Sequence, residues 1–195
     1  VDAAPPHQYS PTEPAICVLA TSVVMAKPRP KPTPLNVASE NSEIANAGIT
    51  PLKTTARAID ADDWEKVVEV NVMGVWRTIR AGLPEIKKNG GQAVIISSSY
   101  AHVNGIFNSS YAVSKAAVEA LGRALQIELA PYGASATIAY FGYVETDLVS
   151  KVFDNAAADR FRDEMVPGFL TKPIKVGKAA GALVEGIENR SLRVI

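Results

Sequence analysis

The most constraining feature of this sequence is an alternation, from residue 42 onward, of short apolar runs with longer amphipathic segments. The apolar runs indicate strands and the longer segments indicate helices, an order that favours a parallel sheet with helices on both faces. The expected strands are 42–47, 92–97, 135–141 and 192–195, and the expected helices are 62–88, 110–130 and 175–189. We therefore predict an α/β fold with right-handed crossovers between its strands.

Local signals support these boundaries. Residues 61–63 provide an acidic, capping start for the helix at 62–88, and residues 131–133 close the helix at 110–130. The apolar centre of 92–97 is typical of a strand in the middle of a parallel sheet.

Residues 1–41 differ in composition from the rest of the chain. Residues 1–47 contain eight of the thirteen prolines and no glycine. The alternating prolines at 28–34 favour an extended polyproline conformation, whereas the β-branched run at 15–25 fits one buried strand. We expect an atypical, Pro-rich and Gly-free region at 1–41, a region at 42–195 that carries the functional site, and one domain overall.

The charge balance narrows the possible partners. Twenty basic and twenty acidic residues give a net charge of zero, so no field of one sign attracts nucleic acid or an anionic membrane. The single cysteine, Cys17, excludes an intrachain disulfide and multi-cysteine metal sites, and we expect no metal. The apolar run at 16–25 is too short to cross a bilayer and precedes the first basic residue, Lys27. We expect a cytoplasmic protein.

Tyr111 and Lys115 are four residues apart at the start of the helix at 110–130. Positions i and i+4 share one helix face, so both side chains are expected to point into one cleft. The ammonium group and the positive end of the helix favour a phenolate, so we expect a lowered pKa for Tyr111 and a general acid/base role. In isolation, however, a Tyr-x-x-x-Lys pair is more often an ordinary surface pair.

Other motifs accompany this pair in a fixed order. They are NAG at 46–48, NVMG at 71–74, IISSS at 95–99, YAVSK at 111–115 and GYVET at 142–146. The successive spacings are 25, 27 and 13 residues between Asn46, Asn71, Ser98 and Tyr111. In these motifs and spacings, residues 42–195 closely resemble the short-chain dehydrogenase/reductase (SDR) family. The resemblance implies a Rossmann-like, three-layer, doubly wound parallel sheet.

The resemblance also implies roles in proton transfer. Tyr111 would exchange a proton with the substrate oxygen, Lys115 would lower the tyrosine pKa and bind the nicotinamide ribose, and Ser98 would orient the substrate carbonyl. Asn71 would hold a water through its main chain in a proton relay behind Lys115. Both neighbours of Ser98 are serines, so a register shift of one residue is an alternative. For Asn71 the alternative is an amide that bonds only locally.

A NAD or NADP site follows from the same resemblance, without a preference between the two. Asn46, Ala47 and Gly48 would line the adenosine side of the cofactor, although an ordinary strand-ending turn also accounts for these residues. Thr146 would bond the nicotinamide carboxamide beside the backbone of Val144, and its alternative role is a helix N-cap.

The substrate side is less well defined. The family has Pro-Gly where this chain has Phe141 and Gly142, which weakens the Thr146 assignment. Residues 147–170 would form a loop that covers the substrate. Their apolar side chains suit either an apolar substrate or packing at helical spacing, and we favour the packing. His102 is expected in a solvated loop.

These assignments predict an oxidoreductase that transfers hydride between NAD(P)(H) and a carbonyl/secondary alcohol pair, acting on the CH–OH group of a small-molecule substrate. The helices expected at 62–88 and 110–130 form subunit interfaces in many relatives. The resemblance therefore implies a homodimer or a homotetramer.

The N-terminal region departs from the family. The family has a glycine-rich TGxxxGxG turn after its first strand, where the pyrophosphate rests on a helix N-terminus, but the first glycine here is Gly48. Fewer residues precede Asn46 than in the family. We therefore expect 1–41 to be an incomplete nucleotide-binding half with missing or irregular strand–helix units, and 42–195 to be the catalytic region.

Three interpretations of this departure stay open. The chain is a divergent member without tight cofactor binding, or it binds cofactor by an unfamiliar route, or N-terminal residues are omitted from or misassigned in the sequence. The sharp change in composition near residue 45 favours the third, and an intact mass of 20.7 kDa would contradict an omission. The alternative function is a non-catalytic binding or scaffold protein that keeps the fold without a working cofactor site.

Overall fold

The computed structural model describes residues 42–51, 54–103, 107–146 and 172–195. The strands are β1 (Ser42–Ala45), β2 (Gln92–Ser98), β3 (Ser135–Phe141) and β4 (Arg193–Val194). The α-helices are α2 (Ala61–Val68), α3 (Val75–Asn89), α4 (Ser109–Leu129) and α8 (Val176–Glu188), and the short helices are η1 (Glu69–Gly74), η2 (Ser99–Ala101) and η3 (Ala130–Tyr132). The region expected at 1–41 and the loop expected at 147–170 lie outside the described residues.

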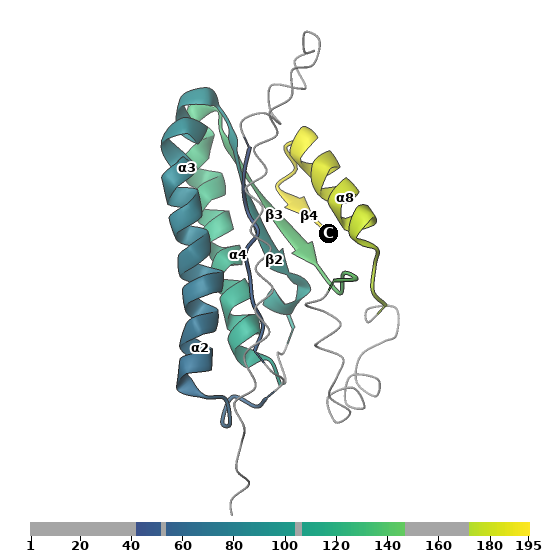
Figure 1. Ribbon diagram of the computed structural model, residues 1–195. Helices are drawn as coiled ribbons and strands as arrows, with labels where there is room; N and C mark the ends of the chain where they lie inside the picture. The colour runs from purple at the N-terminus through teal and green to yellow at the C-terminus, as the bar shows by residue number, and fades with distance from the viewer. Residues whose placement is uncertain (1–41, 52–53, 104–106, 147–171) are drawn as a thin grey trace, which may run out of the picture.

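The four strands form one parallel sheet in the order β1-β2-β3-β4. The register aligns the carboxyl ends of β2 and β3, where Ser98 lies opposite Phe141. Parallel neighbours require crossover connections, which here contain helices. Figure 1 shows α2, α3 and α4 on one side of the sheet and α8 on the other. The structure thus confirms the predicted α/β fold with helices on both faces.

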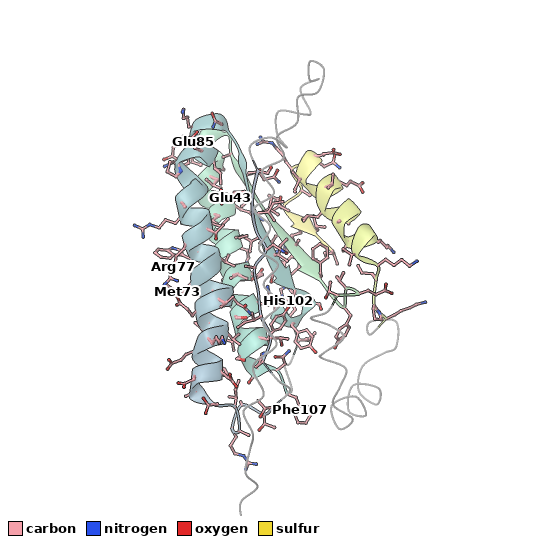
Figure 2. All side chains as sticks on the ribbon, in the orientation of Figure 1. Glu43, Met73, Arg77, Glu85, His102 and Phe107 are labelled. Carbon is pink, nitrogen blue, oxygen red and sulfur yellow. The ribbon has the colours of Figure 1, made fainter. Side chains whose placement is uncertain are left out.

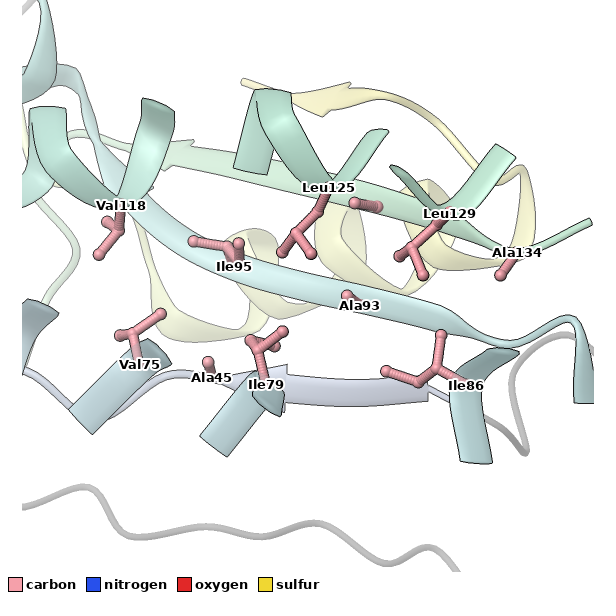
Figure 3. Packing of buried hydrophobic residues seen from close by; sticks show 11 residues of the cluster. Ala45, Val75, Ile79, Ile86, Ala93, Ile95, Val118, Leu125, Leu129 and Ala134 are labelled. Atoms are coloured by element: carbon pink, nitrogen blue, oxygen red, sulfur yellow. The ribbon is translucent and has the colours of Figure 1, made fainter. Parts of the chain in front are cut away.

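Alternation along the strands divides the core between the two faces of the sheet. In β2, Ala93 and Ile95 belong to the cluster that α3 and α4 cover, while Val94 and Ile96 belong to the cluster that α8 covers. Figure 3 shows the first cluster, in which side chains of α3 and α4 pack with Ala93 and Ile95 of β2 on one face of the sheet. Full burial of each Ile or Leu side chain contributes about 1.5–3 kcal/mol. This packing fixes the helices against the sheet and so fixes the groups at their ends.

The helix expected at 62–88 is one helical segment with a change of geometry inside it. The α2 helix begins after Asp60, whose carboxylate accepts a hydrogen bond from the backbone of Asp62 at 2.9 Å, one residue earlier than expected. Residues of η1 then form a π-helix before α3 continues the segment. The predicted helix is therefore present, but the sequence did not predict its π-helical stretch, which contains Asn71.

Two glycines end helices at the amino end of the sheet. Gly90 and Gly133 have positive φ angles of 59° and 64°, a conformation that glycine adopts without steric strain. The carbonyl oxygens of both accept hydrogen bonds from the Arg190 guanidinium. Within the described ranges, no helix combines the length and the hydropathy that a membrane crossing requires.

Candidate active site

The proposed proton-transfer residues come from separate elements that meet toward the carboxyl ends of the strands. Ser98 ends β2, Asn71 lies in η1, and Tyr111 and Lys115 lie in the first two turns of α4. This edge of the sheet is the lower one in Figure 1. Ligands of open parallel sheets bind at this edge, so the fold puts the four side chains where a ligand is expected.

Tyr111 is partly buried and lies beside Lys115 and Ser98. The Lys115 ammonium nitrogen is 5.6 Å from the centre of the tyrosine ring. Burial raises the pKa of Tyr111, and a hydrogen bond with the Ser98 side chain opposes that rise only in part. The sequence-based expectation of a lowered pKa was therefore wrong, because desolvation disfavours the phenolate more strongly than the hydrogen bond with Ser98 favours it.

Lys115 is a buried cation. The residue is 4% exposed, and its Nζ donates a hydrogen bond of 2.9 Å to the carbonyl oxygen of Ile96. Burial lowers the pKa of Lys115 to about 8. An ammonium group has three donors, and this carbonyl is the acceptor that the described residues provide. Lys115 thus keeps donor capacity for a ligand.

Gly48 lies against this ammonium group. A Cβ atom at position 48 would be 3.4 Å from Nζ of Lys115 and 3.5 Å from Oδ1 of Asn71. Because glycine has no side chain, only backbone atoms of residue 48 lie next to the lysine. Of the three NAG residues, Gly48 is therefore the one that the structure brings to Lys115 and Asn71, while Asn46 is partly buried and Ala47 is exposed.

Ser98 is the serine of the IISSS run that lies beside the tyrosine. Its hydroxyl donates to the carbonyl oxygen of Phe141 at 3.0 Å and accepts from the backbone of Tyr100 at 3.2 Å. The preceding Ser97 points to the face of the sheet that α4 covers, and its hydroxyl donates to the carbonyl oxygen of Lys115 at 2.9 Å. Because neighbouring strand residues face opposite sides, this arrangement supports Ser98 over a shifted register.

The Asn71 side chain connects three segments and is fully buried. Its Oδ1 accepts from the backbone N–H of Ile49 at 2.7 Å, and its Nδ2 donates to the Ile49 carbonyl and to Ser114 Oγ, both at 2.9 Å. Ser114 in turn donates to the carbonyl oxygen of Tyr111 at 2.7 Å. The alternative of purely local bonding does not hold, because these partners are 22 and 43 residues away in the sequence.

Val144 and Thr146 form a separate group after β3. The hydroxyl of Thr146 donates to the Val144 carbonyl at 3.3 Å, and Val144 forms a parallel bridge with Ile174. Within the described part of the chain, no hydrogen bond connects either residue to Tyr111 or Lys115. The alternative N-cap role of Thr146 depends on residues from 147 onward, which are outside the description.

Two tyrosines near the site were missed in the sequence. The Tyr100 ring packs edge-on against Tyr111, with centroids 5.7 Å apart, and its hydroxyl lies 3.1 Å from that of Tyr143. Both follow the carboxyl ends of strands, which was the available signal. His102 is exposed, as expected, and its ring lies 5.1 Å from that of Tyr140 (Figure 2).

Known proteins resemble this chain in sequence and in fold. The chain is 38% identical over 108 residues to an NADPH-dependent 1-acyldihydroxyacetone phosphate reductase of Schizosaccharomyces pombe, covering 55% of this chain and 36% of that protein. It is 31% identical over 147 residues to Dehydrogenase OXI1 of Cochliobolus heterostrophus, covering 73% and 62% of the two chains. The chain therefore spans only part of the length of these relatives.

A solved structure shows the same architecture. The gluconate 5-dehydrogenase of Burkholderia cenocepacia, in complex with NADP and tartrate, superposes with a TM-score of 0.67 at 24% identity, covering 79% of this chain and 61% of that one. This likeness confirms the Rossmann-like fold. The family model described as "short chain dehydrogenase" matches residues 42–157, more than half of the chain. This protein belongs to the short-chain dehydrogenase family.

Proposed function

We propose that the protein is an oxidoreductase that transfers hydride between NAD(P)(H) and a carbonyl/secondary alcohol pair on a small-molecule substrate. The observation that carries the proposal is the meeting of Tyr111 with Ser98 and Lys115. Asn71 is connected to the backbone of Tyr111 through the hydroxyl of Ser114. Family membership points to the same chemistry.

Tyr111 is the proposed general acid/base. Because burial raises its pKa, the phenol is protonated near neutral pH and has a proton to give to a carbonyl oxygen. In the oxidising direction the same oxygen takes the proton from the alcohol, and the Lys115 charge and the Ser98 hydroxyl stabilise the phenolate that precedes this step. Ser98 also offers a hydroxyl that orients the substrate oxygen.

The residues fit the nicotinamide half of a dinucleotide. The buried Lys115 ammonium has donor capacity for ribose hydroxyls, and Gly48 leaves room beside it. A bound nicotinamide supplies the hydride. The family assigns Asn46, Ala47 and Gly48 to the adenosine side and Val144 and Thr146 to the carboxamide side; we keep Asn46 and Ala47 there and place Gly48 nearer the nicotinamide ribose, because it lies against Lys115. The other assignments follow the family, and two solved structures of similar fold contain NADP.

The proposed active assembly is a homodimer or a homotetramer. Exposed apolar side chains on the outer surfaces of α3 and α4 include Trp76, Val113 and Ile127, which are 38%, 51% and 77% exposed. Such side chains suit burial against a second copy. Sedimentation velocity on the intact protein measures the assembly directly.

The test of the function is Tyr111→Phe, which removes only the reactive hydroxyl. We expect turnover to fall by at least about 100-fold in assays that follow NADH and NADPH with a panel of aldehydes, ketones and secondary alcohols. The matched control is Tyr132→Phe, because Tyr132 is an exposed tyrosine at the end of η3, the short helix that follows α4. Wild-type activity in Tyr111→Phe, with native circular dichroism, would remove Tyr111 from the mechanism.

A scaffold protein without cofactor is the second candidate, and a specific observation favours it. No glycine precedes Gly48, so a glycine-rich pyrophosphate turn is missing from residues 1–47. Fluorescence titration with NADH and with NADPH separates the two candidates. Binding of either supports the oxidoreductase, and no binding of either supports the scaffold.

A further inference from the structure

The loop after β1 and the start of α4 are joined by a set of contacts that we call the Thr50–Asn108 latch. The Thr50 hydroxyl donates to Asn108 Oδ1 at 3.2 Å, and Asn108 Nδ2 donates to Thr50 Oγ1 at 3.0 Å. The backbone of Thr54 donates to the Phe107 carbonyl at 3.0 Å and forms a parallel bridge with Asn108. Thr50 and Asn108 are both buried, at 8% and 7% exposure.

The latch replaces the usual stabilisation of a helix start. Asn108 occupies the N-cap position of α4, where an asparagine side chain normally accepts a backbone hydrogen bond of the first turn. Here that side chain is turned to Thr50 and makes no capping hydrogen bond. The preceding Phe107 (Figure 2) has a positive φ of 60°, which is uncommon for a residue with a bulky side chain. An uncommon backbone conformation at Phe107 and an unused cap at Asn108 are features that often accompany functional sites.

The latch lies between the Tyr111 turn of α4 and the loop segment at Ile49 that Asn71 holds. The Asn108 carbonyl accepts the first helical hydrogen bond, from Ala112 at 3.1 Å, and Tyr111 precedes Ala112. On the other side, Thr50 follows Ile49, whose N–H and C=O are both held by Asn71. Consecutive residues of one loop are thus tied to η1 and to α4. Ile49 fixes the loop to η1 and Thr50 fixes it to the start of α4, so the Tyr111 turn is held at a set distance from Asn71.

We propose that Thr50 and Asn108 are positioning residues that hold the Tyr111 phenol at a fixed place relative to Gly48 and Asn71. The expected effect on kcat rests on the proposed function, whereas the expected ordering of the first turn of α4 does not. When the latch is broken, the first turn of α4 gains freedom. Tyr111 then spends less time in the orientation that proton transfer needs, so kcat falls while KM changes little.

The test compares two equally drastic substitutions of buried threonines. Thr50→Val removes the latch hydroxyl. Thr137→Val removes a hydroxyl that donates to the Ser191 carbonyl and accepts from Gln92, and it lies in β3 away from the strand end that carries the site. We expect Thr50→Val to lower kcat about tenfold or more, with a shifted pH profile, and Thr137→Val to leave kcat within about twofold. Thr50→Ser keeps the hydroxyl and should restore kcat.

Hydrogen exchange tests the latch even in the absence of turnover. The amide of Ala112 bonds to the Asn108 carbonyl, so it should exchange faster in Thr50→Val than in the wild type or in Thr137→Val. Equal exchange in the two valine variants would overturn the proposal, as would equal losses of kcat. If the wild-type protein turns over no substrate, the proposed function fails. The exchange rates then still decide whether the latch orders the start of α4.

Discussion

Lys115 combines a proposed role in the site with an unfavourable environment. Its ammonium group is buried, with one carbonyl acceptor among the described residues, and burial lowers its pKa to about 8. An unfolded chain leaves a lysine near its ordinary pKa of 10.5. The folded protein therefore binds this proton more weakly than the unfolded protein does, and the buried charge reduces stability at neutral pH.

The predicted consequence is a rise in stability with pH that depends on Lys115. Below pH 8 the lysine is charged in both states, and the penalty is fully present. Between pH 8 and 10.5 the unfolded state keeps a proton that the folded state has lost, so stability rises. The free energy of unfolding should gain about 2 kcal/mol from this group between pH 7 and 9.5.

Urea denaturation of the wild type and of Lys115→Met at several pH values measures this contribution as a difference. The rise should be absent from Lys115→Met and present in Lys178→Met, since Lys178 is exposed on α8. Parallel curves for the wild type and Lys115→Met would show that the charge is better solvated than the structure indicates.

Single residues also show what the sequence could predict at this scale. Ser98 was identified from its motif, and the structure brings it to Tyr111, but the direction of the tyrosine pKa shift was wrong. The sequence reveals which charged neighbours are near. It does not reveal how much water the fold removes, and here burial dominates. Tyr100 was missed for a similar reason, because only the fold shows its ring against Tyr111.

Among the elements, the long helical segment shows the limit of periodicity. Spacing predicted a helix at 62–88, and the observed segment runs through α2, η1 and α3. The π-helical turn between them is not visible in the sequence, because it depends on tertiary contacts. Such turns are rare and frequently occur at functional sites. Here the turn contains Asn71, whose side chain reaches both Ile49 and Ser114.

The contact between α8 and β4 provides a test of packing between elements. Gly186 faces the sheet, and a Cβ atom there would lie 2.1 Å from Cγ2 of Val194. Gly181 lies in the same helix, and a Cβ atom there would meet nothing within 4 Å. The first glycine permits close approach of helix and strand, whereas the second has no such role.

Gly186→Ala should therefore destabilise the protein by about 1–3 kcal/mol, because α8 or Val194 must move. Gly181→Ala should stabilise it by about 0.5–1 kcal/mol, because alanine favours the helix. Thermal denaturation of both variants measures the two effects. Shifts of the melting temperature in the same direction would contradict the described packing of α8 on β4.

At the scale of the whole molecule, the described strands lie side by side in the sheet in the same order as in the chain, β1-β2-β3-β4. Nucleotides bind to doubly wound sheets where the strand order reverses, and the described strands include no reversal. The alternation of apolar runs was sufficient to predict this parallel sheet and its helices. We propose that 42–195 is the catalytic region of one domain and that 1–41 contributes an incomplete nucleotide-binding half.

This division predicts an unusual pattern of cofactor affinity. The residues around Lys115 fit a nicotinamide ribose, whereas residues 1–47 provide no glycine for a phosphate-binding turn. In a protein of these 195 residues, the adenosine diphosphate part of the cofactor should then add little binding energy. We expect the Kd of NADPH to be within about tenfold of that of reduced nicotinamide mononucleotide, a difference of at most about 1.4 kcal/mol.

Fluorescence titration of the intact protein with both nucleotides measures this difference. Lys115→Met serves as the control, because it should weaken both ligands by the same factor if the lysine binds the ribose that they share. Binding of NADPH more than about 100-fold tighter than the mononucleotide, or about 2.7 kcal/mol, would contradict the prediction. Such a result would mean that a phosphate site other than a glycine-rich turn within residues 1–47 holds the pyrophosphate.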